Sequence, residues 1–399
     1  MSRGKRELPR GKQKHRSIGP AVLKYVLTVA AVFAAVVVLR SFLLSEDGDS
    51  GSGTDAGTGT ADPLTLTDSA DAGETAEAET EDADAEAEEI TVTDTAEPVT
   101  ITISAVGDCT LGTDEYFNQS TSLPAYAEEY GLDYFFSNVA DIFTADDLTI
   151  VNFEGVLTTS TARADKTYAF KGDPSYTEIL TSGGVEACNL ANNHSHDYGS
   201  ESYDDTVEYL EAAGLITFGY DSVAVTEVNG VKVGLVGIYE LADPEGCAED
   251  LEACMEAVQE QGAELIIVSF HWGTEKATVP DATQISLGHL AVDLGANLVI
   301  GHHAHVLQGI EEYNGVNIVY SLGNFCFGGN SNPSDKDTMI YQQTFTIVGG
   351  EVQDDLDVTI IPCSLSSVSS YNDYCPTPAE GDEAERILAK IQERSDAIG

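Results

Sequence analysis

The sequence is short of positive charge. It has 18 Lys and Arg against 68 Asp and Glu, which gives a formal net charge of −50 at pH 7. Residues 41–98 contain no Lys or Arg, and residues 99–399 hold nine of them beside 49 acids. A nucleic-acid-binding surface needs a basic footprint, so this composition excludes nucleic acid as a partner. An acidic surface instead attracts cations and keeps an exported domain soluble.

Several common catalytic motifs are also missing. The chain has no Gly-Lys-Ser/Thr phosphate loop, no Gly-x-Ser-x-Gly nucleophile turn and no His-Glu-x-x-His helix. Its seven cysteines decide little, because an exported compartment permits disulfides without requiring them. Cys247 with Cys254 and Cys363 with Cys375 are each either a disulfide or two free thiols, and the others are expected to be small buried side chains.

The N-terminal hundred residues have the composition of a membrane anchor and a spacer. Residues 1–24 hold eight of the 18 basic groups, and residues 25–39 carry no charge. We expect a basic cytoplasmic tail over 1–20 and an uncleaved transmembrane anchor over 21–44, with a cleaved signal peptide as the alternative. Residues 45–98 are acidic and poor in large apolar groups, which is typical of a disordered linker. The remainder should then lie outside the cell.

From residue 99 onward the sequence alternates strand and helix patterns. We expect one domain over 99–365 and a C-terminal extension with a helix over 366–399. The expected strands and helices are 99–106, 124–143, 148–151, 174–181, 185–190, 202–213, 250–261, 265–270, 282–294, 298–300 and 380–394. Asn-Gly and Gly-Gly pairs predict hairpins joining 223–228 to 231–238, 307–313 to 316–321 and 339–348 to 351–361. This mixture predicts an α/β fold with two packed mixed sheets and helices outside.

Polar strings follow five of the expected buried strands. Each begins where an apolar run ends, and three of them contain six of the eight histidines. Ligand sites of open α/β sheets form at the carboxyl ends of strands, so the five strings predict one shared site. A mixture of imidazole, carboxylate and amide groups is suited to a divalent metal, for which Mn, Zn, Fe and Mg are the candidates.

The acidic and amide residues of these strings each have a plainer interpretation. Asp108, after Gly107, is either a metal ligand or a turn residue, and Glu154 is either a ligand or a cap. Asn193 and His194 lie between a strand and a helix that needs only one capping residue, which favours a functional role. Asp197 either orients an imidazole or caps the following helix.

The histidine strings are the strongest signal. His271 is a ligand or a buried loop residue, and the neighbouring Trp272 and Glu275 are candidates for substrate contact. His303 and His305 have the spacing of side chains that point the same way in an extended segment, so both are expected to face the site, with His302 pointing elsewhere. Asn152 and Asn324 complete the set of candidate substrate-binding residues, although Asn324 is equally consistent with a plain turn.

These strings resemble the successive motifs of one known family. The resemblance rests on Gly107-Asp108-Cys109-Thr110-Leu111-Gly112, Asn152-Phe153-Glu154-Gly155, Asn189-Leu190-Ala191-Asn192-Asn193-His194 with Asp197, His271-Trp272-Gly273-x-Glu275, Gly301-His302-His303-Ala304-His305 and Tyr320-Ser321-Leu322-Gly323-Asn324-Phe325. They are similar to the CapA/PgsA poly-γ-glutamate capsule synthesis proteins over about residues 100–330. The resemblance implies a metallophosphoesterase-like fold, a four-layer α-β-β-α sandwich, and a membrane-anchored protein outside the cell.

The resemblance also implies roles for individual residues. The implied metal ligands are Asp108, Glu154, Asn193, His271, His303 and His305, with His194 as general acid oriented by Asp197. Two features depart from the phosphoesterase pattern: Thr110 stands where a histidine ligand is usual, and the bridging acid is Glu154 where Asp is usual. Three hypotheses therefore stay open. The first is a metal-dependent hydrolase of an anionic surface polymer such as poly-γ-glutamate, acting on a phosphoester or a γ-glutamyl amide. The second is a non-catalytic polymer-binding accessory to a membrane synthase. The third is a surface protein whose metal site is purely structural.

Overall fold

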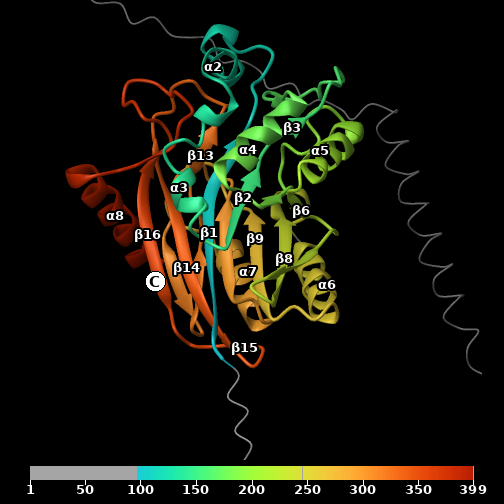
Figure 1. The fold of residues 1–399 in the computed structure, drawn as a ribbon, viewed down its shortest axis with the longest axis vertical. Helices are drawn as coiled ribbons and strands as arrows, with labels where there is room; N and C mark the ends of the chain where they lie inside the picture. Colours follow the sequence, from blue (N-terminus) through green and yellow to red (C-terminus); the bar gives the residue numbers. More distant parts are fainter. Residues whose placement is uncertain (1–96, 245, 399) are drawn as a thin grey trace, which may run out of the picture. The chain divides into compact units, whose positions relative to one another are not determined.

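The computed structural model of the chain describes residues 97–244 and 246–398 (Figure 1). The expected basic tail, the anchor over 21–44 and nearly all of the acidic linker lie outside the described residues. Among the helices of the described ranges, none is both long and apolar enough to span a bilayer.

The described part contains two mixed β-sheets, which confirms the predicted α/β class. The larger sheet has the order β17-β16-β14-β1-β2-β5-β6. Two further strands lie outside this order: β13 pairs with β1, and β15 pairs with β14. Its strands are β1 Val99–Thr110, β2 Leu148–Phe153, β5 Ala187–Asn189, β6 Ile216–Phe218, β13 Asn324–Phe327, β14 Asp337–Val348, β15 Glu351–Val352, β16 Asp357–Ser364 and β17 Thr377–Pro378.

The smaller sheet has the order β11-β12-β10-β9-β8-β7. Its strands are β7 Ala224–Val228, β8 Val231–Tyr239, β9 Leu265–His271, β10 Leu298–His302, β11 Ile310–Tyr313 and β12 Val316–Val319, and a separate short pair is formed by β3 Val156–Leu157 and β4 Lys171–Gly172. The hairpins β7–β8 and β11–β12 are confirmed. Asn229 and Asn314 have φ values of 52° and 49°, and the glycine after each also has positive φ, as a two-residue hairpin turn requires.

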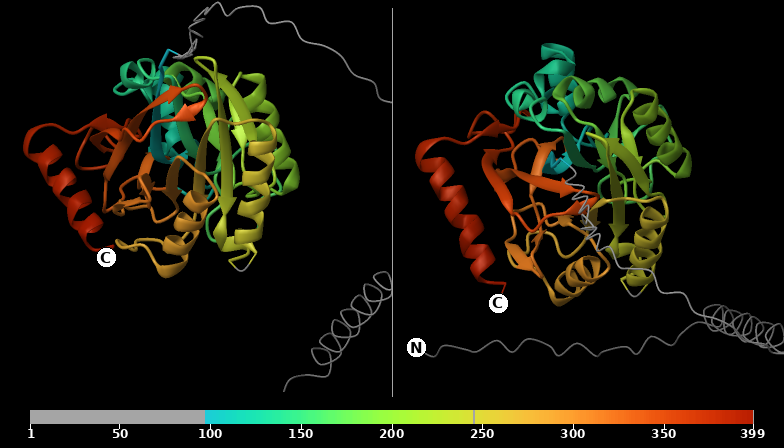
Figure 2. Two further views of the ribbon diagram at one scale, coloured as in Figure 1. Left: turned by 90° about the horizontal axis from the view of Figure 1, so that it is seen from below. Right: turned by 60° about the horizontal axis from the view of Figure 1, so that its bottom comes forward.

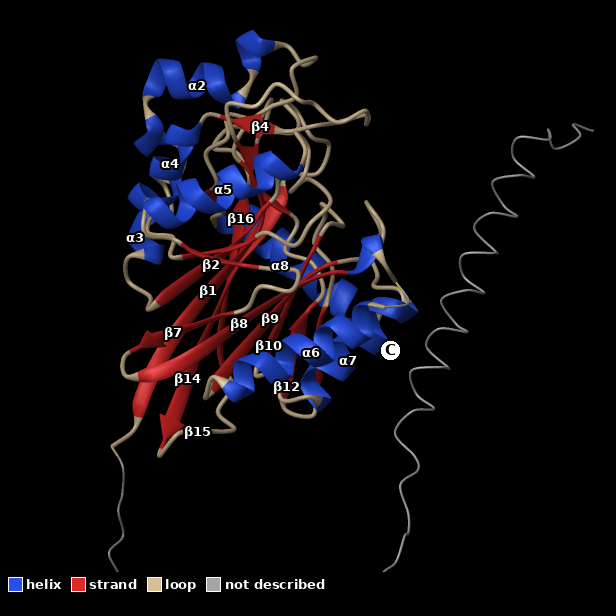
Figure 3. Ribbon diagram, turned by 90° about the vertical axis from the view of Figure 1, so that its right-hand side faces the viewer, coloured by secondary structure: helices blue, strands red, loops and turns tan. Residues whose placement is uncertain are grey.

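Helices cover the outer face of each sheet (Figure 3). The helices are α2 Leu123–Tyr130, α3 Ala140–Phe143, α4 Thr177–Gly183, α5 Ser200–Ala212, α6 Cys247–Glu260, α7 Ala282–Asp293 and α8 Gly381–Asp396, with 3-10 turns η1 Gln119–Thr121, η2 Leu132–Tyr134, η3 Pro174–Tyr176 and η4 Glu240–Ala242. One apolar core fills the space between the sheets. A second lies under α2 to α5, and a third lies under α6 and α7. This layering brings the carboxyl ends of β1, β2, β5, β9 and β10 together.

Residues 366–398 pack onto the same body as the rest of the described chain. β17 pairs with β16, and α8 lies against β16 and β11 at the side of the two sheets (Figure 2). Ile387 and Ile391 of α8 are buried in the core between the sheets. The segment predicted as an extension therefore contributes a strand and part of the central core. The third predicted hairpin differs as well, since the return strand is interrupted after β15 and resumes as β16.

All seven cysteines are free and buried. Cys247 and Cys254 both lie on α6, seven residues apart, which places their Cα atoms roughly 10 Å apart along the helix. That spacing exceeds the reach of a disulfide. Cys109, Cys188 and Cys326 are fully buried in the core under α2 to α5, as expected for small apolar side chains.

Candidate metal centre

Two rows of polar residues face each other at the strand ends. In the larger sheet, strand register aligns Asn189 of β5, Asn152 of β2, Asp108 of β1 and Asn324 of β13. In the smaller sheet, it aligns Tyr239, His271 and His302 of β8, β9 and β10. Neighbours in register on parallel strands point to the same face of the sheet. The rows therefore bring together groups that are far apart in the sequence.

Two glycines allow this close approach. A Cβ atom on Gly107 would lie 2.0 Å from the carbonyl oxygen of Gly323, and one on Gly301 would lie 2.0 Å from that of Tyr320. With glycine at position 107, the Asp108 amide donates to the Gly323 carbonyl at 2.9 Å. Glycine before the functional residue is thus required by backbone packing at both strand ends.

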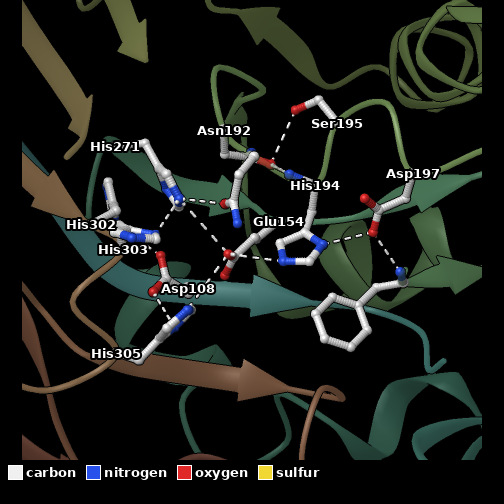
Figure 4. A network of polar contacts seen from close by, with 12 residues as sticks. Asp108, Glu154, Asn192, His194, Ser195, Asp197, His271, His302, His303 and His305 are labelled. Carbon is white, nitrogen blue, oxygen red and sulfur yellow. Dashed lines mark hydrogen bonds and ion pairs between the residues drawn. The ribbon is translucent and has the colours of Figure 1, made fainter. Parts of the chain in front are cut away.

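Glu154 occupies the middle of the cluster (Figure 4). Its side chain is fully buried, and neither carboxylate oxygen has a hydrogen-bond partner. Its Oε1 atom lies 3.7 Å from His305 Nε2, 3.8 Å from His271 Nε2 and 3.9 Å from His194 Nε2. Burial raises the pKa of Glu154 to about 8, against the lowering effect of His305. Burial of a carboxylate without a partner costs free energy, so a bound cation at this position would stabilise the structure.

Asp108 lies beside Glu154 and is also fully buried. Its Oδ1 accepts from the Asn152 amide at 2.8 Å, and its Oδ2 lies 3.0 Å from His305 Nδ1. Although burial raises the pKa of Asp108, the hydrogen bond and charge of His305 hold it well below its usual range. Conversely, burial lowers the pKa of His305, but Glu154 and Asp108 raise it to about 10.

Two other imidazoles of the cluster have a lowered pKa, whereas that of His305 is raised. Burial holds the pKa of His271 well below its usual range and lowers the pKa of His303 to about 4. His271 Nε2 lies 3.1 Å from His303 Nδ1 and 2.8 Å from the amide oxygen of Asn193. Neutral imidazoles that converge on a carboxylate and an amide oxygen are in the protonation state that binds a metal ion.

The donor groups fit a divalent metal. Glu154, His271 and His303 form one trio, and Asp108, Glu154 and His305 form another, with the ligand atoms of each within 4.8 Å of one another. Two bonds of roughly 2.1 Å to one ion separate the donors by about 3.4–4 Å, which is close to the separations around Glu154 Oε1. Because Glu154 belongs to both trios, its carboxylate would be a ligand in either of them. Imidazole donors favour Zn or Fe over Mg, whereas the carboxylate and amide donors also suit Mn.

His194 and Asp197 form a pair at the edge of the cluster (Figure 4). His194 Nδ1 lies 2.6 Å from Asp197 Oδ2, which also accepts from the Phe170 amide at 2.5 Å. Lys166 donates to the other carboxylate oxygen at 2.7 Å and to the Asn193 carbonyl at 2.8 Å. Burial lowers the pKa of His194, against Asp197, which raises it. The pair orients the ring so that Nε2 faces Glu154.

All six predicted ligands and the predicted His194–Asp197 pair therefore lie in one cluster, while the four candidate substrate-binding residues differ in position. Asn152 is buried between Asp108 and His271, so its place is that of a positioning residue. Trp272 is fully buried, and its indole nitrogen donates to the Tyr320 carbonyl at 2.9 Å, which gives it a packing role. Glu275 and Asn324 line a cleft at the edge of the cluster.

Two expectations about the last histidine string are wrong in detail. His302 does not point elsewhere, since register with His271 turns it inward and its Nδ1 lies 3.6 Å from Asp108 Oδ1. His303 and His305 do not form an extended segment, because their φ values are 85° and 56°. Both still face the cluster, held there by a left-handed backbone that is costly for residues other than glycine.

Lys166 and Asn189 contact the cluster but were not among the predicted site residues, although Asn189 lies in one of the quoted motifs. Asn189 donates to the Asn152 side chain at 3.2 Å, and its place in the row depends on strand register. Lys166 lies in a loop without any apolar periodicity, and its contacts with Asn193 and Asp197 arise only from the fold. Thr110, which stands where the phosphoesterase pattern has histidine, is buried with an unpartnered hydroxyl.

Comparison with known proteins gives a consistent result. A PGA biosynthesis protein CapA of Bacillus subtilis is 31% identical over 248 residues, covering 57% of this chain and 63% of that protein. A capsule biosynthesis protein CapA of Bacillus anthracis is 27% identical over 299 residues, covering 68% and 71%. A probable polyglutamine synthesis accessory protein of Mycobacterium tuberculosis is 28% identical over 211 residues, covering 45% and 55%.

The matched segments thus span about three fifths of the B. subtilis protein and somewhat more of the B. anthracis one. The family model described as bacterial capsule synthesis protein PGA_cap matches residues 102–329, which contain every residue of the cluster. The chain belongs to the bacterial capsule synthesis protein family PGA_cap.

Proposed function

We propose that this chain acts in the synthesis or export of a poly-γ-glutamate capsule as a metal-dependent hydrolase with a metallophosphoesterase-like site. The names of its relatives support the capsule context. The observation that carries the catalytic proposal is Glu154, a buried carboxylate with both oxygens unpartnered that belongs to two trios of ligand atoms. The position of an anchor over 21–44, with the folded domain outside the cell, is part of the same proposal.

A bound divalent ion would polarise the bond to be broken and lower the pKa of an attacking water. This chain's own residues supply the proton transfer. Asp197 fixes the His194 ring at 2.6 Å, so its Nε2 can take up the proton released by the attacking water and pass it to a leaving group beside Glu154. Phe170 packs on the same ring with centroids 4.5 Å apart and shields it from bulk water. Lys166 balances the charge of Asp197.

A second candidate function is a non-catalytic accessory that holds nascent polymer beside a membrane synthase. It is favoured by Thr110, which leaves one usual ligand position without a donor, and by the M. tuberculosis relative, whose name describes an accessory protein. In this case the cluster would bind an ion and polymer without turnover.

The two candidates differ in what His194 contributes. The purified full chain, loaded in turn with Mn, Zn, Fe or Mg, would be assayed on bis-p-nitrophenyl phosphate and on γ-glutamyl oligomers. Hydrolase function predicts that His194→Gln lowers kcat by roughly 10²- to 10⁴-fold at unchanged metal content. The matched control is His196→Gln, an exposed histidine two residues away, which should leave kcat unchanged.

A chain that retains metal but is inert on both substrates, with His194→Gln supporting capsule formation as well as wild type, would refute hydrolysis in favour of the accessory function. The anchor is tested separately. A protease added to intact cells should remove the folded domain, and its survival in the cell-associated fraction would contradict the proposed orientation.

A further inference from the structure

A cleft of about 650 Å³ opens beside the metal centre. His194 and His305 of the cluster line its inner end. Six aromatic side chains line it further: Tyr116, Phe117, Tyr168, Phe170, Phe327 and Tyr374. The metal-centre chemistry described above uses only Phe170 of these. One aromatic ring is enough to shield His194, so the other five indicate that the cleft has a further role as a binding surface.

Four of these aromatic side chains form a continuous path that starts at His305: Phe327, Phe170, Tyr168 and Phe117. Phe327 lies against His305 with ring centroids 5.4 Å apart and against Phe170 at 6.3 Å. Tyr168 is two residues before Phe170, and their rings are nearly parallel, at 5° and with centroids 6.4 Å apart. Phe117 packs against Tyr168 at 5.8 Å.

Two of the rings at the outer end are strongly exposed. Tyr168 is 51% exposed and Tyr116 is 75% exposed, although large apolar groups are normally withdrawn from water. Arg163, held by Asp114, covers Tyr116 with its guanidinium 4.7 Å from the ring centroid. The ring is thus held in place while much of its surface stays open to solvent.

The rest of the lining is polar but almost uncharged. Exposed hydroxyl and amide side chains come from Asn118, Thr121, Asn330, Ser331 and Ser334. The acidic and basic side chains of the lining are Glu275, Lys276 and Asp335, beside His194 and His305 of the cluster, and Asp335 is paired with Lys390 at 3.2 Å. Fixed charge of either sign is therefore sparse in the lining, which suits a neutral ligand better than a charged one.

We propose that this cleft binds a short neutral carbohydrate, with its sugar rings on the aromatic surface and its hydroxyl groups on the amides and hydroxyls. The C–H face of a pyranose ring is apolar and slightly positive, so it packs on the negative face of an aromatic ring. Its hydroxyl groups need the neutral donors and acceptors that line the cleft. The proposal goes beyond the proposed function, because it assigns this cleft a ligand other than poly-γ-glutamate.

Calorimetric titration of the full chain with neutral tetrasaccharides of glucose, galactose and N-acetylglucosamine tests this. We expect saturable binding of at least one of them, weakened at least tenfold by Tyr168→Ala and preserved within about threefold by Tyr168→Phe, which keeps the ring face. Tyr130→Ala is the matched control, since Tyr130 is also 51% exposed but does not line the cleft. Circular dichroism spectra of all variants would establish that they fold alike.

Three results would overturn the proposal: no tetrasaccharide binds, binding is equally reduced by Tyr130→Ala, or a γ-glutamyl tetramer binds instead and depends on Tyr168. The measurement is made with and without added metal, which separates this proposal from the catalytic one. Sugar binding that depends on Tyr168 in a chain that retains no metal would refute the metal-dependent function and support the cleft assignment.

Discussion

Replacement of Asn152 by alanine should lower the stability and the metal affinity of the chain, although Asn152 is buried and is not placed to contact substrate. The Asn152 amide donates to Asp108 Oδ1 at 2.8 Å, lies 3.2 Å from His271 Nδ1 and accepts from Asn189 at 3.2 Å. Asn152→Ala leaves the Asp108 oxygen and the Asn189 amide buried without these partners. At about 1–3 kcal/mol for each orphaned group, the free energy of unfolding should fall by about 4 kcal/mol.

The same change should weaken metal binding, because Asn152 holds two groups that belong to the two ligand trios. Loss of such a supporting contact typically costs 10- to 100-fold in metal affinity. Competition with a chromophoric chelator measures this affinity, and urea unfolding measures stability. The matched control is Asn317→Ala, since Asn317 is buried in β12 away from the cluster and bonds Gln343 at 3.4 Å. If Asn152→Ala and Asn317→Ala bind metal equally well, the positioning role is refuted.

Three further predictions concern stability. Burial raises the pKa of Asp146 to about 6 and of Glu186 to about 7, so the stability that their protonated forms contribute below pH ~4 is lost as the pH rises through 6 and 7. Buried histidines with a lowered pKa, such as His303, change stability in the opposite direction, so the prediction concerns the difference between two proteins. From pH 5 to pH 8 the urea midpoint of Asp146→Asn should fall less, or rise more, than that of the wild type, and equal slopes would contradict this. Gly107→Ala should cost about 3 kcal/mol or more, because its Cβ would meet the Gly323 carbonyl at 2.0 Å; a fully stable variant by urea unfolding would count against the required close approach. Asp281→Ala removes the capping box of α7 and should cost about 1 kcal/mol in the same assay with metal content unchanged, whereas an unchanged unfolding midpoint would show that the cap contributes nothing.

Much of the site could be predicted because its signal is local in the sequence. An apolar run that ends in a polar string identifies a strand end, and strand ends in such folds meet at one edge. This reasoning was sufficient to group Asp108, Glu154, His271 and His305. The same local patterns predicted the hairpins at Asn229 and Asn314, because an Asn-Gly pair adopts positive φ at low cost.

What could not be predicted depends on register and on backbone conformation. His302 faces inward because it aligns with His271 on the neighbouring strand, and its own sequence context gives no sign of this. Asn152 became a buried support through contacts with Asp108 and Asn189, neither of which is close in sequence. The left-handed conformation of His303 is imposed by tertiary packing, so the extended geometry assumed from spacing was wrong.

The central claim, that distant side chains share a cation at the strand ends, is tested most directly by elemental analysis of the freshly purified full chain. We expect one or two equivalents of a divalent transition metal in the wild type, less than a tenth of that in Glu154→Ala, and full retention in His196→Gln. A wild-type chain that holds no metal after exposure to Zn, Mn and Fe, or a Glu154→Ala variant that binds as much as wild type, would contradict it.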